Sequence, residues 1–202
     1  VKLADIEGGA AGGRPIHNTL EPTCDIEVVG VGDLNGDGFA DLAAASYIPD
    51  ESCSSRAFVV LGEPASSGAI ELDATLANVI AIDSPDWSLD GPRGVGDVNG
   101  DGFDDLSVRE GSLFIGGTSY VFFGGSPLES RTTVELAGGQ GGVAIGQLLG
   151  FDEGAIRGSG VGDVNGDGVD DLLVAKTSAP YDTSQYARVL FGAPDLAADG
   201  PG

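Results

Sequence analysis

The residues best suited to chemistry in this chain are aspartates that recur with asparagine and glycine in three similar phrases. The phrases read GVGDLNGDGFADLAAA from Gly30, GVGDVNGDGFDDLSVR from Gly94 and GVGDVNGDGVDDLLVA from Gly160. If the first aspartate is position one, side-chain oxygens occupy positions one, three, five and nine, and glycines occupy positions four and six. Alternate residues of a tightly curled loop can direct their oxygens at one centre, and glycine permits the positive φ angles that the curl requires. The pattern predicts a cation site in each phrase.

The ligand set that each phrase offers consists of oxygen alone. Three carboxylates, one amide oxygen and the backbone carbonyl of position seven suit calcium, and neither thiolate nor imidazole is present to favour zinc or copper. We therefore expect three Ca²⁺ ions per chain. The predicted ligands are Asp33, Asn35, Asp37, Phe39 and Asp41 in the first phrase, Asp97, Asn99, Asp101, Phe103 and Asp105 in the second, and Asp163, Asn165, Asp167, Val169 and Asp171 in the third.

Two other interpretations of the phrases are possible. Asp, Asn and Gly form good turns without any metal, but three mutually repelling carboxylates retained in three copies favour a neutralising ion. EF-hand and dockerin loops share the opening DxNxDG, but they need an acidic residue at position twelve and helical flanks. Position twelve is Ala44, Val108 or Val174, each within an apolar run typical of a strand. Asp104 and Asp170 at position eight are interpreted as solvent-facing or outside the ligand sphere, because the first phrase has Ala40 there.

The elements that must position these loops are short strands. The phrases recur about every 65 residues, and such a period is the signature of a repeat architecture. Each phrase is followed by DLAAAS, DLSVRE or DLLVAK, then by RAFVVLG, SYVFFGG or ARVLFGAP, and the first two repeats end in AIELDAT or TTVELAGG. Runs of four to eight such residues bounded by Gly, Pro, Asp and Ser indicate strands. We predict an all-β fold of four-stranded antiparallel β-propeller blades, three per chain, with the acidic loop between strands one and two.

The ends of the chain suggest how the blades are divided. VKLADIEG resembles the predicted fourth strands, so residues 1–8 are expected to form an orphan outer strand, and the last repeat is expected to lack its outer strand. The chain is predicted to be a single partial propeller domain, residues 1–202, with blades at about 26–75, 76–137 and 138–202. Three blades are too few to close a propeller. A homodimer or additional propeller repeats would complete the ring.

Composition limits the partners of the chain. The 32 acidic and 9 basic residues give a formal net charge of −23, which repels phosphate backbones and anionic membrane surfaces, so nucleic acid is not an expected partner. Acidity of this degree is also typical of solubility or a halophilic habit. No apolar stretch has the length of a membrane span. Cys24 and Cys53 flank the first loop and could form a disulfide outside the cell or remain thiols inside it.

On these residues the chain resembles the FG-GAP repeats of integrin alpha-subunit propellers and their prokaryotic relatives. The calcium loop recurs three times at blade spacing, and VFFGG, FGAP and SAP at residues 121–125, 191–194 and 178–180 are further traces of that repeat. Integrin propellers have seven blades, only some of which carry metal, whereas all three repeats here carry the ligand pattern. The resemblance implies an extracellular or cell-surface, calcium-stabilised module for protein interaction or adhesion, with an unidentified ligand.

Catalytic patterns are scarce in the sequence, and we do not expect an enzyme. The single histidine, His17, lies in an unpatterned segment, and no GxSxG nucleophile motif occurs. The most suggestive carboxylate cluster outside the loops is Asp83, Asp86 and Asp90 around Trp87, interpreted as a solvated connection. The alternative function is a calcium-dependent polysaccharide-acting enzyme of propeller fold.

Overall fold

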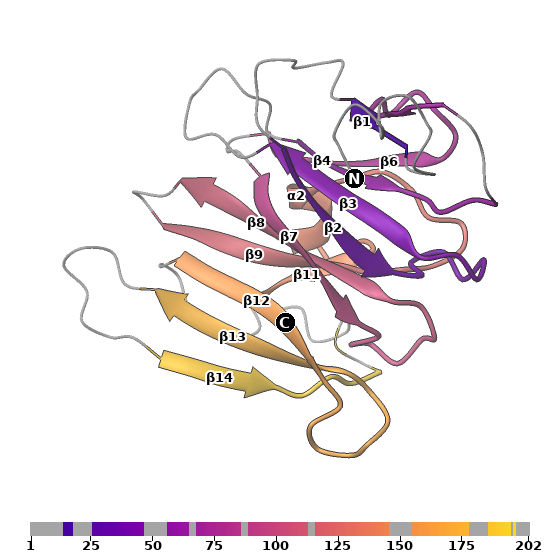
Figure 1. The fold of residues 1–202 in the computed structure, drawn as a ribbon. Helices are drawn as coiled ribbons and strands as arrows, with labels where there is room; N and C mark the ends of the chain where they lie inside the picture. Colours follow the sequence, from indigo (N-terminus) through magenta and orange to yellow (C-terminus); the bar gives the residue numbers. More distant parts are fainter. Residues whose placement is uncertain are drawn as a thin grey trace, which may run out of the picture.

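The computed structural model describes residues 14–17, 26–46, 56–64, 68–85, 89–112, 116–145, 155–177, 186–194 and 196. The regular secondary structure of this part of the chain is almost all β-strand, with one short helix, and its strand pairs are mostly antiparallel (Figure 1). The prediction of an all-β fold is confirmed. The strands form three antiparallel units, which we call the first, second and third units, and each begins with a strand that enters an acidic loop.

The first two units each contain four strands, and each strand pairs with the next strand of its unit along the chain. The first unit consists of β2 (Ile26–Gly32), β3 (Asp41–Ser46), β4 (Arg56–Val60) and β6 (Val79–Asp83). The second consists of β7 (Leu89–Gly96), β8 (Asp105–Ser112), β9 (Gly116–Phe122) and β11 (Gly142–Ala144). Side chains alternate between the two faces of each strand, so both faces of these sheets can be buried.

The third unit has three strands within the described residues. They are β12 (Ala155–Gly162), β13 (Asp171–Thr177) and β14 (Tyr186–Leu190), paired in that order. A single parallel bridge between Ala155 and Gly117 joins this unit to the second. Strands two and three of every repeat lie where the sequence predicted them. They could be predicted because turn-forming residues such as Asp and Gly flank these strands.

The predicted fourth strands are wrong in both repeats that have one. AIELDAT contributes only β5 (Ile70–Glu71), which pairs in parallel with β1 (Ile16–His17), and the fourth strand is β6. The fourth strand of the second unit is β11, not TTVELAGG. The predicted blade boundaries at about 75–76 and 137–138 therefore fall too early, because β6 pairs with β4 and β11 pairs with β9.

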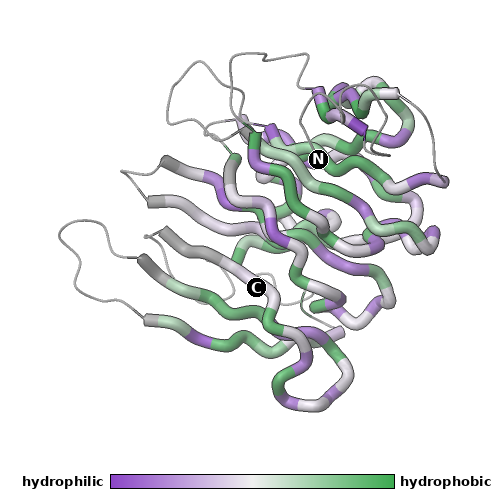
Figure 2. The backbone as a smooth tube through the Cα atoms, in the orientation of Figure 1, coloured by the Kyte–Doolittle hydropathy of each residue, from purple (hydrophilic) through white to green (hydrophobic). Residues whose placement is uncertain are grey.

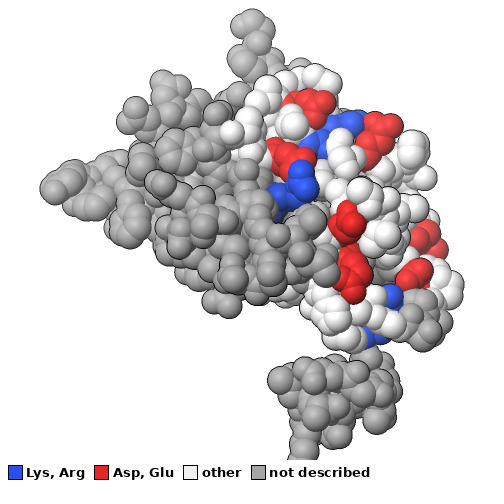
Figure 3. Space-filling view, turned by 90° about the horizontal axis from the view of Figure 1, so that it is seen from above, with Lys and Arg blue, Asp and Glu red and all other residues white. Residues whose placement is uncertain are grey.

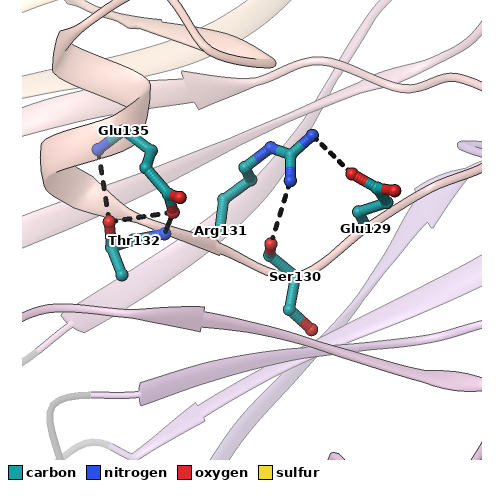
Figure 4. A network of polar contacts seen from close by, with 5 residues as sticks. All are labelled: Glu129, Ser130, Arg131, Thr132 and Glu135. Atoms are coloured by element: carbon teal, nitrogen blue, oxygen red, sulfur yellow. Dashed lines mark hydrogen bonds and ion pairs between the residues drawn. The ribbon is translucent and has the colours of Figure 1, made fainter.

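The segment TTVELAGG forms a short helix instead of a strand. After β10 (Arg131–Thr132), helix α2 spans Thr133–Ala137. The Thr132 hydroxyl accepts a hydrogen bond from the Glu135 amide at 3.2 Å, and the Glu135 carboxylate accepts from the Thr132 amide at 2.7 Å (Figure 4). This reciprocal pair is a capping box, which satisfies two amides that would otherwise lack partners at a helix start. Figure 4 also shows the adjacent ion pair of Arg131 with Glu129, at 2.9 Å.

The hydrophobic core lies between the units. One cluster fills the space between the first and second units and includes Ala43, Val59, Ile82, Leu106 and Phe122, all buried. A second cluster between the second and third units includes Val121, Phe123, Leu172 and Val174. Figure 2 shows hydrophobic residues along the stacked strands and hydrophilic residues in the connecting turns. A third cluster covers the other face of the first unit, where Ile16 and Ile70 of β1 and β5 pack.

Several features predicted from the sequence lie outside the described residues. These are the orphan strand at residues 1–8, both cysteines of the possible Cys24–Cys53 pair, and Asp86 and Trp87 of the carboxylate cluster. Of the helices in the part that is described, none is both long and apolar enough to cross a membrane.

Candidate metal centres

The three acidic loops connect strands one and two of their units and follow one another along the same side of the molecule (Figure 1). The glycines at positions four and six adopt the predicted positive φ angles, for example 73° at Gly36 and 88° at Gly38. The glycines just before the loops, such as Gly32 with φ of 89°, also turn left-handed, and the strand register shifts there. Glycine adopts these angles readily, whereas they are unfavourable for other residues, so the loops form the predicted tight curl.

The aspartate at position one organises each loop by accepting backbone amides. In the first loop, Asp33 Oδ1 accepts from Gly36 at 2.8 Å and from Asp37 at 3.1 Å, and Oδ2 accepts from Gly38 at 2.8 Å. Asp163 accepts the corresponding bonds in the third loop from Gly166, Asp167 and Gly168. These bonds, with that from Gly168 first, lower the pKa of Asp163. The backbone of the loop is thus wrapped around an ionised carboxylate.

Positions three and five form a second, smaller set of contacts. Asn35 Oδ1 accepts from the Asp37 amide at 3.0 Å, while Asn35 Nδ2 donates to Asp37 Oδ2 at 2.9 Å. Asp37 Oδ1 also accepts from the amide of Phe39 at 2.8 Å. The same three bonds occur in the second loop, between Asn99, Asp101 and Phe103, and in the third, between Asn165, Asp167 and Val169.

The aspartate at position nine is buried and fixes the loop to the end of strand three. Asp105 Oδ2 accepts from Val98 at 2.9 Å, and Oδ1 accepts from Gly124 at 2.9 Å. Burial is the main reason that the pKa of Asp105 rises to about 7, and repulsion from Asp101 and Asp97 adds to it. Asp41 and Asp171 are also fully buried and accept the equivalent amides. Three carboxylates of one loop therefore lie close enough to affect one another.

The aspartate at position eight has a role that sequence reasoning missed. Asp104 Oδ2 accepts from the amide of Asp33 at 2.8 Å, and the Asp104 amide donates to the Asp33 carbonyl at 3.1 Å. Asp170 makes the same pair of bonds to Asp97, at 3.1 and 3.0 Å. The interpretation as a solvent-facing group is corrected: each side chain joins its loop to the preceding one. The available signal was the change from Ala40 to aspartate in the two repeats that follow another repeat.

The side chain at position seven makes a further contact between successive loops. A Cβ placed on Gly36 would lie 2.6 Å from the Phe103 ring, and one on Gly100 would lie 3.3 Å from Val169. These glycines therefore also provide the space for the next loop to pack closely. Phe39, which has no preceding loop in the described residues, is 41% exposed. The three loops that carry the predicted ligands therefore form one connected row.

The donor set of each loop fits a hard divalent cation. An ionised carboxylate has about four acceptor positions. Asp33 uses three for amides of its own loop, while Asp37 and Asp41 use two each. Oxygen lone pairs thus remain at positions one, five and nine. Within the described residues, no group of three or more acidic, histidine or cysteine side chains is already placed to hold a metal ion.

Two polar residues that were considered for catalysis, His17 and Asp83, have structural partners. His17 Nδ1 lies 3.1 Å from Glu71 Oε1, across the pairing of β1 with β5. Asp83, from the carboxylate cluster, forms an ion pair with Arg56. These contacts explain the positions of both side chains without a reaction.

Two comparisons with known proteins bear on the repeats. The family model of the FG-GAP repeat matches residues 27–51 and 157–191. The first segment contains the first loop with most of β2 and all of β3, and the second contains the third loop with most of β12 and all of β13 and β14. A search of curated protein sequences finds no match.

Proposed function

Because the chain is an FG-GAP repeat protein, we propose that it is a calcium-binding, integrin-like β-propeller module for extracellular protein interaction or adhesion. The observation that supports calcium binding most strongly is that three successive loops repeat the same bonds: the position-one aspartate accepts the amide of position six, and the position-five aspartate accepts the amide of position seven. A turn needs only one such carboxylate. The additional carboxylates at positions five and nine repel it, and bound calcium would supply the missing positive charge.

The residues of each loop have separable parts in this function. Positions one, three and five, together with the carbonyl at position seven, would hold the ion at the exposed end of the hairpin. Position nine would hold it from the buried side, where Asp105 already feels the charge of Asp101 and Asp97. Because Asp104 and Asp170 tie the second and third loops to the loops before them, an ion that stiffens one of these loops would also stiffen the junction between units.

The concentration of free calcium determines how many of the sites are occupied and how much they stabilise the fold. Extracellular calcium sites have dissociation constants near ~0.1 to 1 mM, so about 1 mM calcium would stabilise the fold by roughly 0.4 to 1.4 kcal/mol per site. Three sites would supply on the order of 1 to 4 kcal/mol, a large part of the stability of an ordinary domain. The proposed setting is therefore outside the cell, where calcium reaches this concentration.

The first prediction concerns removal of the metal. We expect chelator to lower the midpoint of thermal unfolding by about 2 to 16 °C relative to 1 mM calcium, measured by differential scanning calorimetry. Magnesium at the same concentration should restore less of the loss, since it dehydrates reluctantly and demands octahedral geometry. Glu129→Gln, which removes an exposed carboxylate outside the loops, should leave the calcium effect unchanged. Equal midpoints with chelator and with calcium would refute the proposal.

A further inference from the structure

A cavity between the second and third units collects basic and hydroxyl side chains. It has a volume of about 170 Å³ and is lined from β7, β8 and β9 of the second unit and from β12 of the third, which lies beside β9 (Figure 1). Two of the nine basic residues of the chain line it, so positive charge gathers here although the formal net charge is −23. We call it the junction cavity; its lining includes Arg93, Ser107, Arg109, Ser119, Gly158 and Ser159.

The strand register places four of these side chains on one face of the second unit. Arg93 of β7 lies opposite Ser107 of β8. Two residues further along β8, Arg109 lies opposite Ser119 of β9. Residues opposite one another in a sheet, and residues two apart on one strand, point to the same face. Val121, also opposite Ser107, packs in the hydrophobic cluster between the second and third units, so this face is the one turned towards the third unit.

A glycine of β12 leaves room for the junction cavity. A Cβ added to Gly158 would lie 3.1 Å from Ser107 Oγ and 2.6 Å from Ile145 Cδ1. The first strand of the third unit therefore lies close to the Ser107 hydroxyl without filling the space beside it. Ser159 lines the cavity and is also exposed, so a small solute can enter from solvent.

Ser107 provides a buried donor that the protein itself does not use. The residue is 2% exposed, and its hydroxyl forms no hydrogen bond with any group of the described residues. Most buried polar side chains do have a partner, because leaving one unpaired is costly. Since the hydroxyl lines the junction cavity, a ligand held there would supply that partner.

Arg93 also keeps donors for a ligand. Its Nη1 donates to Glu27 Oε1 at 2.7 Å and to the Pro92 carbonyl at 2.6 Å. A guanidinium carries five N–H donors. Those on Nε and Nη2 of Arg93 bond to no acceptor in the part of the chain that the structure describes. Arg109, which is 3% exposed, adds a second positive charge at the buried end of the cavity, where Arg109 and Ser119 also have other partners.

The carboxylate that follows Arg109 in β8 points away from the junction cavity. Successive residues of a strand point to opposite faces. Glu110 accepts hydrogen bonds from the hydroxyls of Tyr120 at 2.7 Å and Thr133 at 2.9 Å. Tyr120 belongs to the hydrophobic cluster between the first and second units, which is the opposite face of the sheet. Glu110 therefore does not occupy the cavity.

We propose that the junction cavity binds a small tetrahedral oxyanion, of which sulfate and phosphate are the simplest members. Guanidinium and hydroxyl groups are the donors that such anions prefer. Donors on three strands of two units would surround more oxygens than the two of a planar carboxylate. The volume is below the roughly 300 to 1,000 Å³ of sites for drug-sized ligands, so the ligand is small. This site goes beyond the proposed function and does not depend on calcium binding.

The test titrates sodium sulfate into the full chain at constant ionic strength and follows the amide NMR signals of β7, β8 and β12. The wild type should show saturable shifts. Arg93→Gln should weaken the affinity about tenfold, because a charged donor is lost, and Ser107→Ala roughly fivefold. Arg131→Gln is the matched control, since it also removes an arginine that pairs with a glutamate, but outside the cavity, and it should leave the affinity unchanged.

Two results would overturn the proposal. One is a wild type without saturable shifts at these strands, and the other is an equal loss of affinity in Arg93→Gln and Arg131→Gln, which would assign the effect to overall charge. Sodium acetate, titrated in the same way, should bind at least tenfold more weakly than sulfate. Equal binding of acetate would contradict a site for a tetrahedral anion.

Ser107→Ala also separates loss of the ligand from loss of the fold. Because the hydroxyl has no partner in the described residues, the variant without sulfate should unfold at the same temperature as the wild type or higher. Sulfate should raise the midpoint of the wild type more than that of the variant, and an equal rise would show only its general effect on proteins. That outcome would overturn the proposal. Measurements with chelator and with calcium distinguish this site from the loops: absence of a calcium effect concerns only the proposed function.

Discussion

Aspartates in the loops perform distinct tasks that depend on their position. At position one the side chain collects the amides of its own loop, as the half-buried Asp33 does. At position eight, Asp104 reaches the preceding loop, and at position nine, Asp105 is buried between the loop and the end of strand three. All of these residues are aspartates, so their surroundings set their pKa: amide donors lower the pKa of Asp163, and burial raises that of Asp105.

The buried carboxylate makes the stability of the metal-free protein depend on pH. The pKa of Asp105 is 3.8 in the unfolded chain, and burial raises it to about 7 in the folded protein. Below pH 3.8 the Asp105 carboxyl is protonated in both states and does not change the stability. Between pH 3.8 and about 7 only the unfolded state releases the proton, so the free energy of unfolding falls as pH rises. Above about pH 7 the carboxyl is ionised in both states, and the free energy of unfolding falls no further on its account. One group contributes a slope of at most about 1.4 kcal/mol per pH unit.

Asp105→Asn tests this dependence, because asparagine does not titrate. In chelator, we expect urea unfolding to show a flatter decline between pH 4.5 and 7 in the variant than in the wild type. Comparing the two proteins cancels the contribution of the other acidic residues. Parallel pH profiles would show that Asp105 is ionised throughout this range.

At the scale of elements, the junctions between loops set how the units pack. The bond from the Asp33 amide to Asp104 joins the first loop to the second, and that from Asp97 to Asp170 joins the second to the third. The first loop has Ala40 at this position, which shows that alanine is compatible with the loop itself. The carboxylate therefore serves the junction more than the curl.

Removal of this carboxylate should destabilise the packed units. We expect Asp104→Ala to lower the free energy of unfolding by about 1 to 2 kcal/mol, because the part-buried Asp33 amide loses its acceptor. Ala40→Asp is the matched control and should change stability by less than about 0.5 kcal/mol, since no preceding loop is present in the described residues. Chemical unfolding in urea measures both. Equal effects of the two substitutions would contradict a role at the junction.

The elements also show how far the sequence predicts this fold. Strands one to three and their loops could be predicted, because glycine and aspartate punctuate them at fixed positions. The helix α2 could not, because the alternation in TVEL imitates a strand: Val134 is 64% exposed and Leu136 is buried. The capping pair of Thr132 with Glu135 was the competing signal. The fourth strands β6 and β11 depend on pairing with β4 and β9, which a local pattern does not reveal.

At the scale of the whole molecule, the formal net charge of −23 opposes close packing of acidic loops. Figure 3 shows basic side chains (blue) beside carboxylates (red) on the face seen from above. Ion pairs such as Arg93 with Glu27, at 2.7 Å, neutralise charge outside the loops. Three bound calcium ions carry six positive charges, so they would change the formal net charge from −23 to −17. The same ions would stabilise the junctions along which the loops follow one another.

The number of calcium ions bound by the full chain tests the central claim most directly. Isothermal titration calorimetry of the chelator-treated wild type should give three sites per chain, and Asp37→Ala, Asp101→Ala and Asp167→Ala should each give one fewer. Glu63→Gln, a carboxylate outside the loops that pairs with Arg14, should keep all three. Binding of no calcium by the wild type, or an unchanged number of sites in the loop variants, would contradict the account.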